Sequence, residues 1–346
     1  MPGDPDPLDR FDRQVRFAPL GRAGQERVQA ARVLLVGCGA LGGVLAQSLA
    51  RAGVGELVLV DRDIVELSNL PRQVLFDEAD ARAGRPKALA AAAALARFGG
   101  PTRCRAHAVH LDAQNVGELA TGADLVLDGT DNLATRYLLN DFCVDHARPW
   151  IYAGVVGAAG LVLPVRPGGG ACLRCVFPEP PPPGILPTCD TAGVLLPAAG
   201  AVASFAAGLA LRLLAGPAAA QDLVPALVEI DVWNGEVRRI PAPRDPDCPC
   251  CARGERPWLD TPPGTGALAL CGRRTVQIPP GPRPPDLEAL AQRLAGVATD
   301  VVAAGVLLRF RVESYRLTLF RDGRALVEGT DDPERARAVF DRYVGS

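Results

Sequence analysis

A glycine-rich segment near the start of the chain is its clearest chemical motif. Gly37-Cys38-Gly39-Ala40-Leu41-Gly42 follows the apolar run 32–36 and precedes residues 41–52, which have the composition of a helix. Glycines in this position let the backbone approach a phosphate, and a helix N-terminus favours negative charge. Asp61 ends the next apolar run, where a carboxylate can accept ribose hydroxyls. These residues predict an adenine-nucleotide site and leave open which nucleotide binds, because NAD and FAD enzymes share the motif.

Cationic residues downstream bear on that choice. Only one of the 37 basic residues is a lysine, Lys87, and it ends the segment Gly84-Arg85-Pro86-Lys87. Arg72 lies between Asp61 and Lys87 in the sequence. Backbone amides often suffice for the pyrophosphate of a dinucleotide, whereas cleavage of a triphosphate needs cations near the leaving pyrophosphate. Arg72 and Lys87 together favour a triphosphate, although each alone is also explained as a surface cation.

Two C-x-x-C pairs lie far apart in the sequence. Each pair can occupy two corners of a tetrahedral metal ion, and two pairs complete a closed four-cysteine zinc site of structural type. Cys250 makes the second pair ambiguous, although Cys248 and Cys251 have the required spacing. The predicted ligands are Cys172, Cys175, Cys248 and Cys251.

The elements that must position these residues alternate along the first half of the chain. Short apolar runs at 32–36, 56–61, 105–109 and 124–128 alternate with helix-like segments at 41–52 and 88–98. This alternation predicts a doubly wound, Rossmann-like α/β fold whose mostly parallel sheet is covered on both faces. Runs at 150–156, 160–165 and 227–232 predict an antiparallel extension of that sheet.

The chain is expected to end in a second, smaller domain. We expect a first domain with the cysteine site over residues 1–251, a Pro- and Gly-rich linker over 252–270 and a small α+β domain of unknown role over 271–346. Residues 191–211 carry no charge and reach a membrane-spanning length, but Ala and Gly dominate them, so a buried helix is the better interpretation.

Composition excludes several classes of protein. A 346-residue chain with 48% hydrophobic and 22% charged residues is globular rather than disordered. A net charge of −2 gives no electrostatic reason to bind nucleic acid. The first six residues lack the features of a signal peptide, so we expect a cytoplasmic protein, off the membrane, whose cysteines are thiols or metal ligands.

Five motifs in order make the chain resemble the MoeB/ThiF/HesA family, the bacterial relatives of ubiquitin-activating enzymes. Besides the glycine loop they are Arg10-Phe11-Asp12-Arg13-Gln14, the segment from Asp61-Arg62-Asp63 through Ser68-Asn69-Leu70-Pro71-Arg72-Gln73, Gly84-Arg85-Pro86-Lys87 and Asp128-Gly129-Thr130-Asp131-Asn132. The resemblance covers about residues 8–251. It implies an ATP-dependent adenylyltransferase that activates the C-terminal glycine of a ubiquitin-like sulfur-carrier protein ending in Gly-Gly.

The resemblance also implies roles for individual residues. Asp61 would bind ribose, with Asp63 a less certain contact, and Asp131 would position Mg²⁺. Asn69, Arg72 and Lys87 would hold the phosphates beside the loop residues Gly37, Gly39, Ala40, Leu41 and Gly42. Arg13 would act on the nucleotide of the other subunit of a homodimer. Cys189, in Thr188-Cys189-Asp190-Thr191-Ala192-Gly193-Val194, matches the cysteine that in some members bonds covalently to the carrier or its sulfur.

Some alternatives stay open at this point. An NAD-dependent oxidoreductase explains the glycine loop and Asp61 but leaves Arg13, Arg72, Lys87 and Asp131 without a role. A catalytically inactive, partner-binding relative is a further alternative. The tail lacks a rhodanese-like active loop, so sulfur would come from a separate sulfurtransferase or cysteine desulfurase. The pathway, whether molybdopterin, thiamine, tRNA thiolation or cysteine supply, is not identified by the sequence.

Overall fold

The structure is a computed structural model that describes residues 6–166, 168–181, 185, 189–260, 268–269, 274–281, 284–303 and 305–345. The chain divides into two compact units, Met1–Thr261 and Pro262–Ser346. Each unit has its own sheet and its own buried core.

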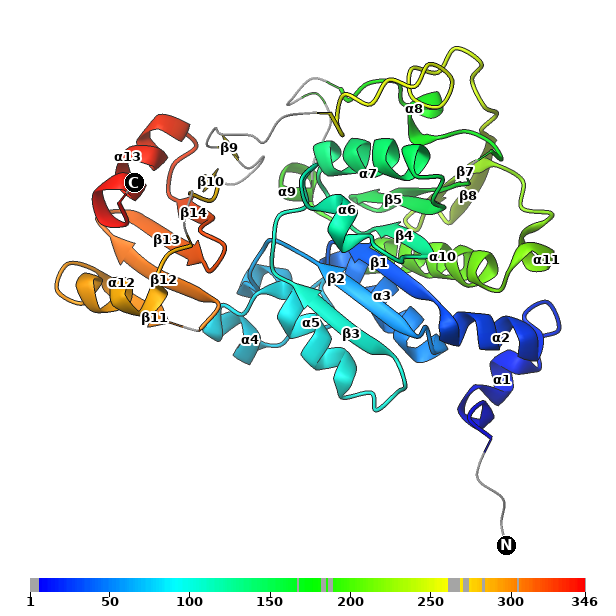
Figure 1. Ribbon diagram of the computed structural model, residues 1–346, viewed down its shortest axis with the longest axis horizontal. Coiled ribbons are helices and arrows are strands. Elements are labelled where there is room, and N and C mark those ends of the chain that lie inside the picture. The colour runs from blue at the N-terminus through cyan, green and yellow to red at the C-terminus, as the bar shows by residue number, and fades with distance from the viewer. Residues whose placement is uncertain are drawn as a thin grey trace, which may run out of the picture. The chain divides into compact units, whose positions relative to one another are not determined.

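An eight-stranded sheet forms the centre of the first unit, in the order β3-β2-β1-β4-β5-β6-β7-β8 (Figure 1). The pairs from β3 to β5 are parallel, and those from β5 to β8 are antiparallel. This confirms the predicted fold class. The strands are β1 (Arg32–Val36), β2 (Glu56–Val60), β3 (Arg103–His107), β4 (Leu125–Asp128), β5 (Trp150–Val156), β6 (Ala159–Val165), β7 (Ala226–Asp231) and β8 (Glu236–Pro241).

Helices cover both faces of this sheet, as the apolar strands require. On β1, Val33 and Leu35 belong to the core on one face, whereas Leu34 and Val36 belong to the core on the other. The first core is closed by α3 (Ala40–Ala52), α5 (Lys87–Ala96) and α10 (Leu196–Leu214), and the second by α6 (Val116–Leu119) and α7 (Leu133–Asp145). The remaining helices of the unit are η1 (Asp9–Phe11), α1 (Asp12–Val15), α2 (Gly21–Ala30), η2 (Leu67–Asn69), α4 (Glu78–Ala83), α8 (Leu173–Val176), α9 (Cys189–Ala192) and α11 (Pro217–Ala220).

The long apolar helix α10 is the one described helix with the length and composition to cross a membrane. In the structure it packs against α3 and against β5, β6 and β7. The face that meets them is made of small side chains with almost no exposed area, Ala198, Ala199, Val202, Ala203, Ala206 and Ala210. It is therefore a core helix of the first unit, as the sequence predicted.

The second unit is an antiparallel sheet with two helices on one face. Its six strands have the order β11-β12-β13-β14-β10-β9, and α12 (Leu287–Leu294) and α13 (Pro333–Tyr343) contribute to the core with β10 and β12–β14. The strands are β9 (Leu268–Ala269), β10 (Thr275–Ile278), β11 (Thr299–Ala303), β12 (Leu307–Val312), β13 (Tyr315–Phe320) and β14 (Ala325–Glu328). Asp286 and Asp332 cap the two helices by accepting hydrogen bonds from their first-turn amides.

Several elements differ from the sequence-based expectation. Strand β3 begins and ends two residues earlier than predicted, and β8 and β11 were not predicted at all. All six residues of β8 are exposed, so its sequence shows no apolar periodicity to detect. Residues 252–260, expected to begin a linker, belong to the first unit, where the ring centroids of Trp258 and Tyr137 lie 5.5 Å apart.

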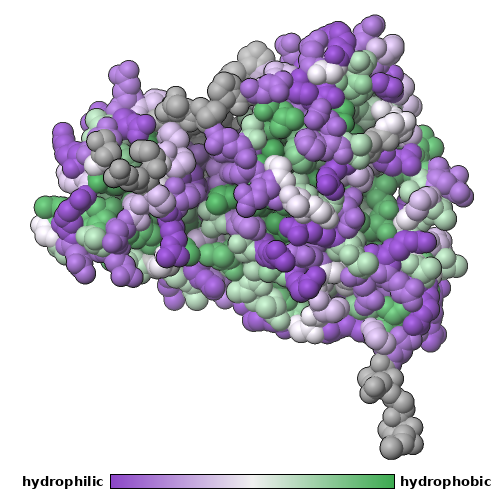
Figure 2. All heavy atoms as spheres, in the orientation of Figure 1, coloured by the Kyte–Doolittle hydropathy of each residue, from purple (hydrophilic) through white to green (hydrophobic). Residues whose placement is uncertain are grey.

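The visible surface combines hydrophilic and apolar side chains (Figure 2). Figure 2 shows hydrophilic side chains over much of the visible face, with apolar patches between them. The most exposed large apolar side chain among the described residues is Trp233, which is 78% exposed in the turn between β7 and β8.

Candidate active site

The glycine loop lies where three parallel strands end side by side. Gly37 follows β1, its N–H donates to the Val60 carbonyl at the end of β2, and the Gly129 N–H after β4 donates to the Val36 carbonyl, both at 2.7 Å. Gly37 has φ +89°, and a Cβ there would lie 2.6 Å from the Gly129 carbonyl carbon. A Cβ at Gly42 would overlap the Gly37 carbonyl oxygen. Glycine is required because neither position has room for a side chain.

Asp61 braces this loop from the end of β2. Its Oδ2 accepts a hydrogen bond from the Cys38 N–H and its Oδ1 accepts one from the Asp63 N–H, both at 2.7 Å. Burial raises the pKa of Asp61, and the nearby Lys87 ammonium partly offsets that rise. Each carboxylate oxygen keeps further lone-pair capacity. A ligand hydroxyl could therefore bind Asp61 without loss of the bonds that hold the loop.

Lys87 is buried beside the same strand end, at the start of α5. Its side chain is 4% exposed, and its Nζ lies 3.1 Å from Oδ2 of Asp63. The Lys87 backbone N–H donates to the Asp63 carbonyl at 2.9 Å, and an isolated bridge joins Ile64 to Pro86. A buried ammonium next to an anion-favouring loop is suited to a highly charged phosphate chain.

The segment after η2 brings two amide side chains to the loop. Asn69 is 1% exposed and accepts from the Glu66 N–H at 3.2 Å, while its Nδ2 has no partner among the described residues. Gln73 is 4% exposed, and its Nε2 lies 3.5 Å from the Cβ position of Gly39. Its Oε1 also lacks a partner within the described part of the chain. Buried amides without partners are costly, and a ligand can supply the missing bonds.

Arg72 lies on the same segment and is half-buried. Its Nη1 donates to the Ser68 carbonyl at 2.7 Å, which holds the guanidinium near η2. Sequence reasoning named Asn69 and Arg72 but gave Gln73 no role. Its closeness to Gly39 is a tertiary contact that sequence spacing does not reveal.

The loop after β4 is fixed by a buried ion pair. Asp128 has no exposed surface and accepts from the Thr130 N–H at 2.8 Å, from Thr130 Oγ1 at 2.7 Å and from Arg136 Nε at 3.2 Å. Burial raises the pKa of Asp128, and the Arg136 guanidinium opposes that rise. Arg136 also donates to the Thr130 carbonyl at 2.6 Å. Asp131 is thereby held on the exposed part of this loop, at the carboxyl edge of the sheet.

Arg13 lies at the other end of α3. It is exposed on α1, whose Gln14 donates to the Ala52 carbonyl in the last turn of α3 at 3.2 Å. The 13 residues of α3 separate this position from the glycine loop, a length of about 20 Å at 1.5 Å per residue. The structure thus does not bring Arg13 to the nucleotide loop of its own chain.

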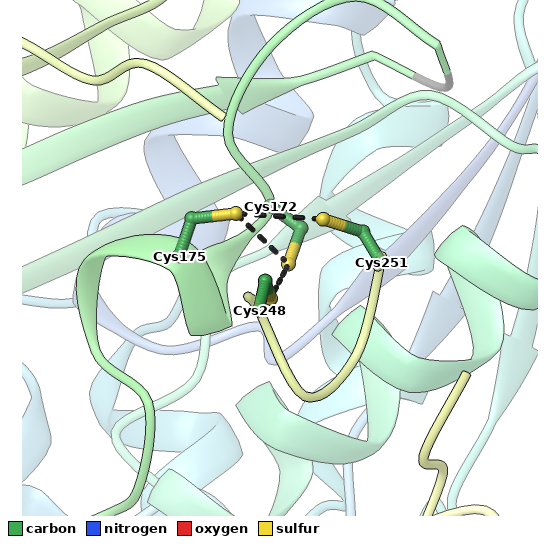
Figure 3. Close-up of side chains that lie close together, drawn as sticks. All are labelled: Cys172, Cys175, Cys248 and Cys251. Carbon is green, nitrogen blue, oxygen red and sulfur yellow. Dashed lines mark hydrogen bonds between the residues drawn. The ribbon is translucent and has the colours of Figure 1, made fainter. Parts of the chain in front are cut away.

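The four predicted metal ligands converge in the second core of the first unit. Figure 3 shows their sulfur atoms facing one another, from the segment around α8 and from the turn at 248–251. Sγ–Sγ distances are 3.6 Å for Cys172–Cys248, 3.8 Å for Cys172–Cys175 and 3.5 Å for Cys175–Cys251, and all four atoms lie within 4.8 Å of one another. A tetrahedron with Zn–S bonds of 2.3 Å requires about 3.8 Å. The cluster therefore has the size of a four-thiolate zinc site.

Cys250 lies beside this cluster but has another role. Its Sγ accepts from Asn140 Nδ2 at 3.1 Å, and Asn140 Oδ1 accepts from the Leu173 N–H at 2.9 Å. Asn140 thereby joins the two cysteine segments. Fully buried Asp141 accepts from the Trp258 N–H at 3.2 Å and lies 3.7 Å from Arg174. The four sulfur atoms that lie within 4.8 Å of one another are those of Cys172, Cys175, Cys248 and Cys251, which favours Cys248 and Cys251 as the second pair.

The predicted nucleophile Cys189 begins α9, but its side chain lies outside the described residues. The backbone that follows is anchored at the sheet. Gly157, in the β5–β6 turn, donates its N–H to the Gly193 carbonyl and accepts from the Leu195 N–H, both at 2.9 Å. Because β5 runs parallel to β4, this turn lies at the same edge as the glycine loop.

Comparison with known proteins decides the family. The family model described as "ThiF family" matches residues 11–250. The chain belongs to the ThiF family. The sulfur carrier protein ThiS adenylyltransferase of Bacillus subtilis (strain 168) is 39% identical over 339 residues, which cover 97% of this chain and 99% of that protein. The family resemblance inferred from the motifs is thus confirmed, and the chain is a nucleotidyltransferase.

Two further relatives define the extent of the match. The adenylyltransferase and sulfurtransferase MOCS3 of Sus scrofa is 43% identical over 255 residues, covering 73% of this chain and 55% of that protein. The chain thus spans about half the length of MOCS3. The E. coli MccB structure with ATP matches at a TM-score of 0.61 and 22% identity, covering 72% of this chain and 76% of that one. This structural likeness shows the shared fold.

Proposed function

We propose that this ThiF-family enzyme uses Mg-ATP to adenylylate the C-terminal glycine of a ubiquitin-like sulfur-carrier protein. The single observation that carries the proposal is the buried Lys87 ammonium beside the glycine loop and Asp61. A dinucleotide site has no evident need for a buried cation there, whereas a triphosphate does. The relatives named as sulfur-carrier or ThiS adenylyltransferases support the choice of acceptor.

The nucleotide would lie across the ends of β1, β2 and β4. Loop residues 37–42 would contact the phosphates through the backbone, and Asp61 would accept the ribose hydroxyls. Asn69, Arg72 and Lys87 would balance the charge of the phosphate chain. Asp131, exposed on the braced loop after β4, would hold Mg²⁺, a hard cation that prefers oxygen ligands and would neutralise the triphosphate.

The reaction needs alignment more than acid–base chemistry. A carboxylate oxygen of the carrier glycine attacks the α-phosphorus, the bond to the leaving pyrophosphate breaks, and a mixed acyl–AMP anhydride forms. The attacking group is already ionised, so no general base is required. Positioning and charge neutralisation by Arg72 and Lys87 would supply the rate enhancement.

Arg13 is proposed to serve a second subunit. Because α3 separates it from its own glycine loop, we propose that it reaches the phosphates of a partner copy in a homodimer. A dimer would then be needed for full activity, and each site would contain one arginine from the other chain.

The cysteines divide between structure and chemistry. The cluster Cys172, Cys175, Cys248 and Cys251 would bind zinc as four thiolates with no open position, and so would hold its two segments together. Burial raises the pKa of Cys175, and a bound cation would instead favour the thiolate form that metal ligation requires. Cys189 would act after adenylation, as the thiol that attacks the acyl–AMP or accepts sulfur, with sulfur supplied by a separate sulfurtransferase or cysteine desulfurase.

ATP–pyrophosphate exchange tests the proposal. Purified protein with Mg-ATP and labelled pyrophosphate should exchange label only when a carrier ending in Gly-Gly is added. A panel of the organism's carriers identifies the partner, and a carrier lacking its last glycine is the matched control. If none of the carriers in the panel supports exchange, the proposal is wrong. Calorimetric titration with ATP and NAD side by side separates it from an oxidoreductase, since only ATP should bind tightly.

A further inference from the structure

Asp63 faces the only lysine of the chain. The Asp63 Oδ2 to Lys87 Nζ distance is 3.1 Å, and the Lys87 side chain is 4% exposed while that of Asp63 is 23% exposed. The other carboxylate oxygen, Oδ1, lies 3.8 Å from Arg62 Nε. The carboxylate therefore bridges two cations at the end of β2.

Its neighbour Asp61 is engaged differently. Both oxygens of Asp61 accept backbone amides, from Cys38 and from Asp63 itself. Asp61 acts on Lys87 through its charge, since burial raises the pKa of Asp61 and the Lys87 ammonium partly offsets that rise. Asp63 is in hydrogen-bond contact with the ammonium. The two acidic residues of Asp61-Arg62-Asp63 thus have separate tasks, one toward the loop and one toward the lysine.

Electrostatics argue against Asp63 as a direct phosphate contact. A carboxylate and a triphosphate repel each other, whereas a buried ammonium without a counter-charge is strongly disfavoured. A carboxylate beside Nζ keeps the amine charged and restricts its rotamers. The side chain is not needed to dock α5, because the Asp63 carbonyl and the Ile64–Pro86 bridge do this through the backbone.

We infer that Asp63 is a positioning residue that holds Lys87 charged and in place for the triphosphate, without itself contacting the nucleotide or its metal. The inference rests on the proposed ATP-dependent function of the site. It replaces the expectation that Asp63 binds the cofactor. Substitution of Asp63 should act only through Lys87.

A double-mutant cycle measures this dependence directly. The affinity for Mg-ATP is measured by calorimetry for the wild type, Asp63→Asn, Lys87→Ala and the double variant. We expect Asp63→Asn to weaken binding about tenfold and Lys87→Ala about 100-fold. The double variant should be no weaker than Lys87→Ala alone. If the two losses multiply, Asp63 contacts the nucleotide or Mg²⁺ independently and the inference is wrong.

Controls separate positioning from structure. Asp63→Glu, which keeps the charge, should recover part of the affinity. Arg105→Gln removes an ion pair with Glu56, which begins β2 and so lies at the end of the strand away from Asp63. It should leave the affinity for Mg-ATP unchanged. Thermal unfolding of each variant should stay cooperative near the wild-type midpoint. If Asp63→Asn does not fold, Asp63→Ser takes its place in the cycle.

The single lysine allows a readout that does not depend on catalysis. Protein labelled with ¹³C-lysine should give one side-chain resonance, that of Lys87, because the chain has no other lysine. The charged and titratable groups around it include Asp61, Asp63, Arg62 and Cys38. Asp63→Asn should lower the pH at which this resonance titrates. If the Lys87 resonance titrates identically in the wild type and in Asp63→Asn, the inference is wrong. If the titration differs but the wild type does not bind ATP, only the proposed function is refuted.

Discussion

The proposed nucleotide site at the carboxyl edge of the sheet, called here the nucleotide edge, and the cysteine cluster are both buried sites in the first unit. They are built in opposite ways. At the nucleotide edge, Asn69 and Gln73 keep amide atoms without partners in the described structure, and the Lys87 ammonium at the start of α5 pairs with the Asp63 carboxylate after β2. At the cluster, the sulfurs face each other, and Asn140 joins the two cysteine segments by hydrogen bonds to Cys250 and Leu173. A site with unpaired hydrogen-bonding groups suits a ligand that binds reversibly, whereas a closed cluster of ligands suits a permanently bound ion.

Loss of the proposed zinc should therefore have the largest effect on the fold. Cys172→Ser, or a strong chelator at neutral pH, should lower the free energy of unfolding on the order of 5 kcal/mol, because the segments around α8 and 248–251 lose their common ligand. Chemical denaturation with a zinc assay measures this. The neighbour Cys250→Ser is the matched control and should retain the metal. Equal loss of metal in both variants would show that the ligand set is misassigned.

Gly42→Ala should break the nucleotide edge by geometry alone. Its Cβ would overlap the Gly37 carbonyl oxygen, so the loop must shift, at a cost of about 3 kcal/mol. We expect Mg-ATP binding to be lost in calorimetry. Gly43→Ala is the matched control, because its Cβ would meet Val74 and Leu75 at an ordinary 3.7 Å. Normal ATP binding by Gly42→Ala would exclude the loop from the site.

Lys87→Ala should lower carrier-dependent exchange about 100-fold while the fold survives. Lys87→Arg should also be impaired, because a planar guanidinium does not replace a compact ammonium. Arg85→Ala, which removes a cation two residues away that pairs with Asp80, should leave the rate of exchange unchanged. If Lys87→Arg is fully active, the reaction does not require a lysine at this position.

Cys189→Ala should have the smallest effect on the first reaction. We expect exchange at the wild-type rate and loss of any covalent carrier adduct, scored by non-reducing electrophoresis and mass spectrometry. Cys104→Ala, on β3, serves as a control that keeps the adduct. Survival of the adduct in Cys189→Ala would remove Cys189 from the mechanism.

The two regions also differ in how far the sequence predicts them. The cysteine ligands follow from spacing alone, since each C-x-x-C pair is local and only the meeting of the pairs is tertiary. The glycine loop, Asp61 and Lys87 follow from ordered motifs, which also identify the fold class and the family. Spacing did not predict that Gln73 approaches Gly39, or that Arg136 pairs with Asp128, because these contacts depend on how α3, α7 and the strand ends pack.

Strand errors have a related cause. β8 is exposed on all six residues, with Arg238 and Arg239 in its middle, so it shows neither alternation nor an apolar run. β3 lies at the other edge of the sheet, where Arg103 and Arg105 pair with Glu56 of β2 rather than with a core. Edge strands are the part of such a sheet where sequence patterns are weakest.

Mass spectrometry of the carrier tests the central claim most directly. Intact carrier ending in Gly-Gly is incubated with this enzyme, Mg-ATP and pyrophosphatase, and its mass is recorded before any sulfur donor is added. The account predicts a carrier species heavier by one adenylyl group at the C-terminal glycine, formed by the wild type and not by Lys87→Ala. If enzyme that binds ATP leaves every carrier in the panel unmodified, the account is contradicted.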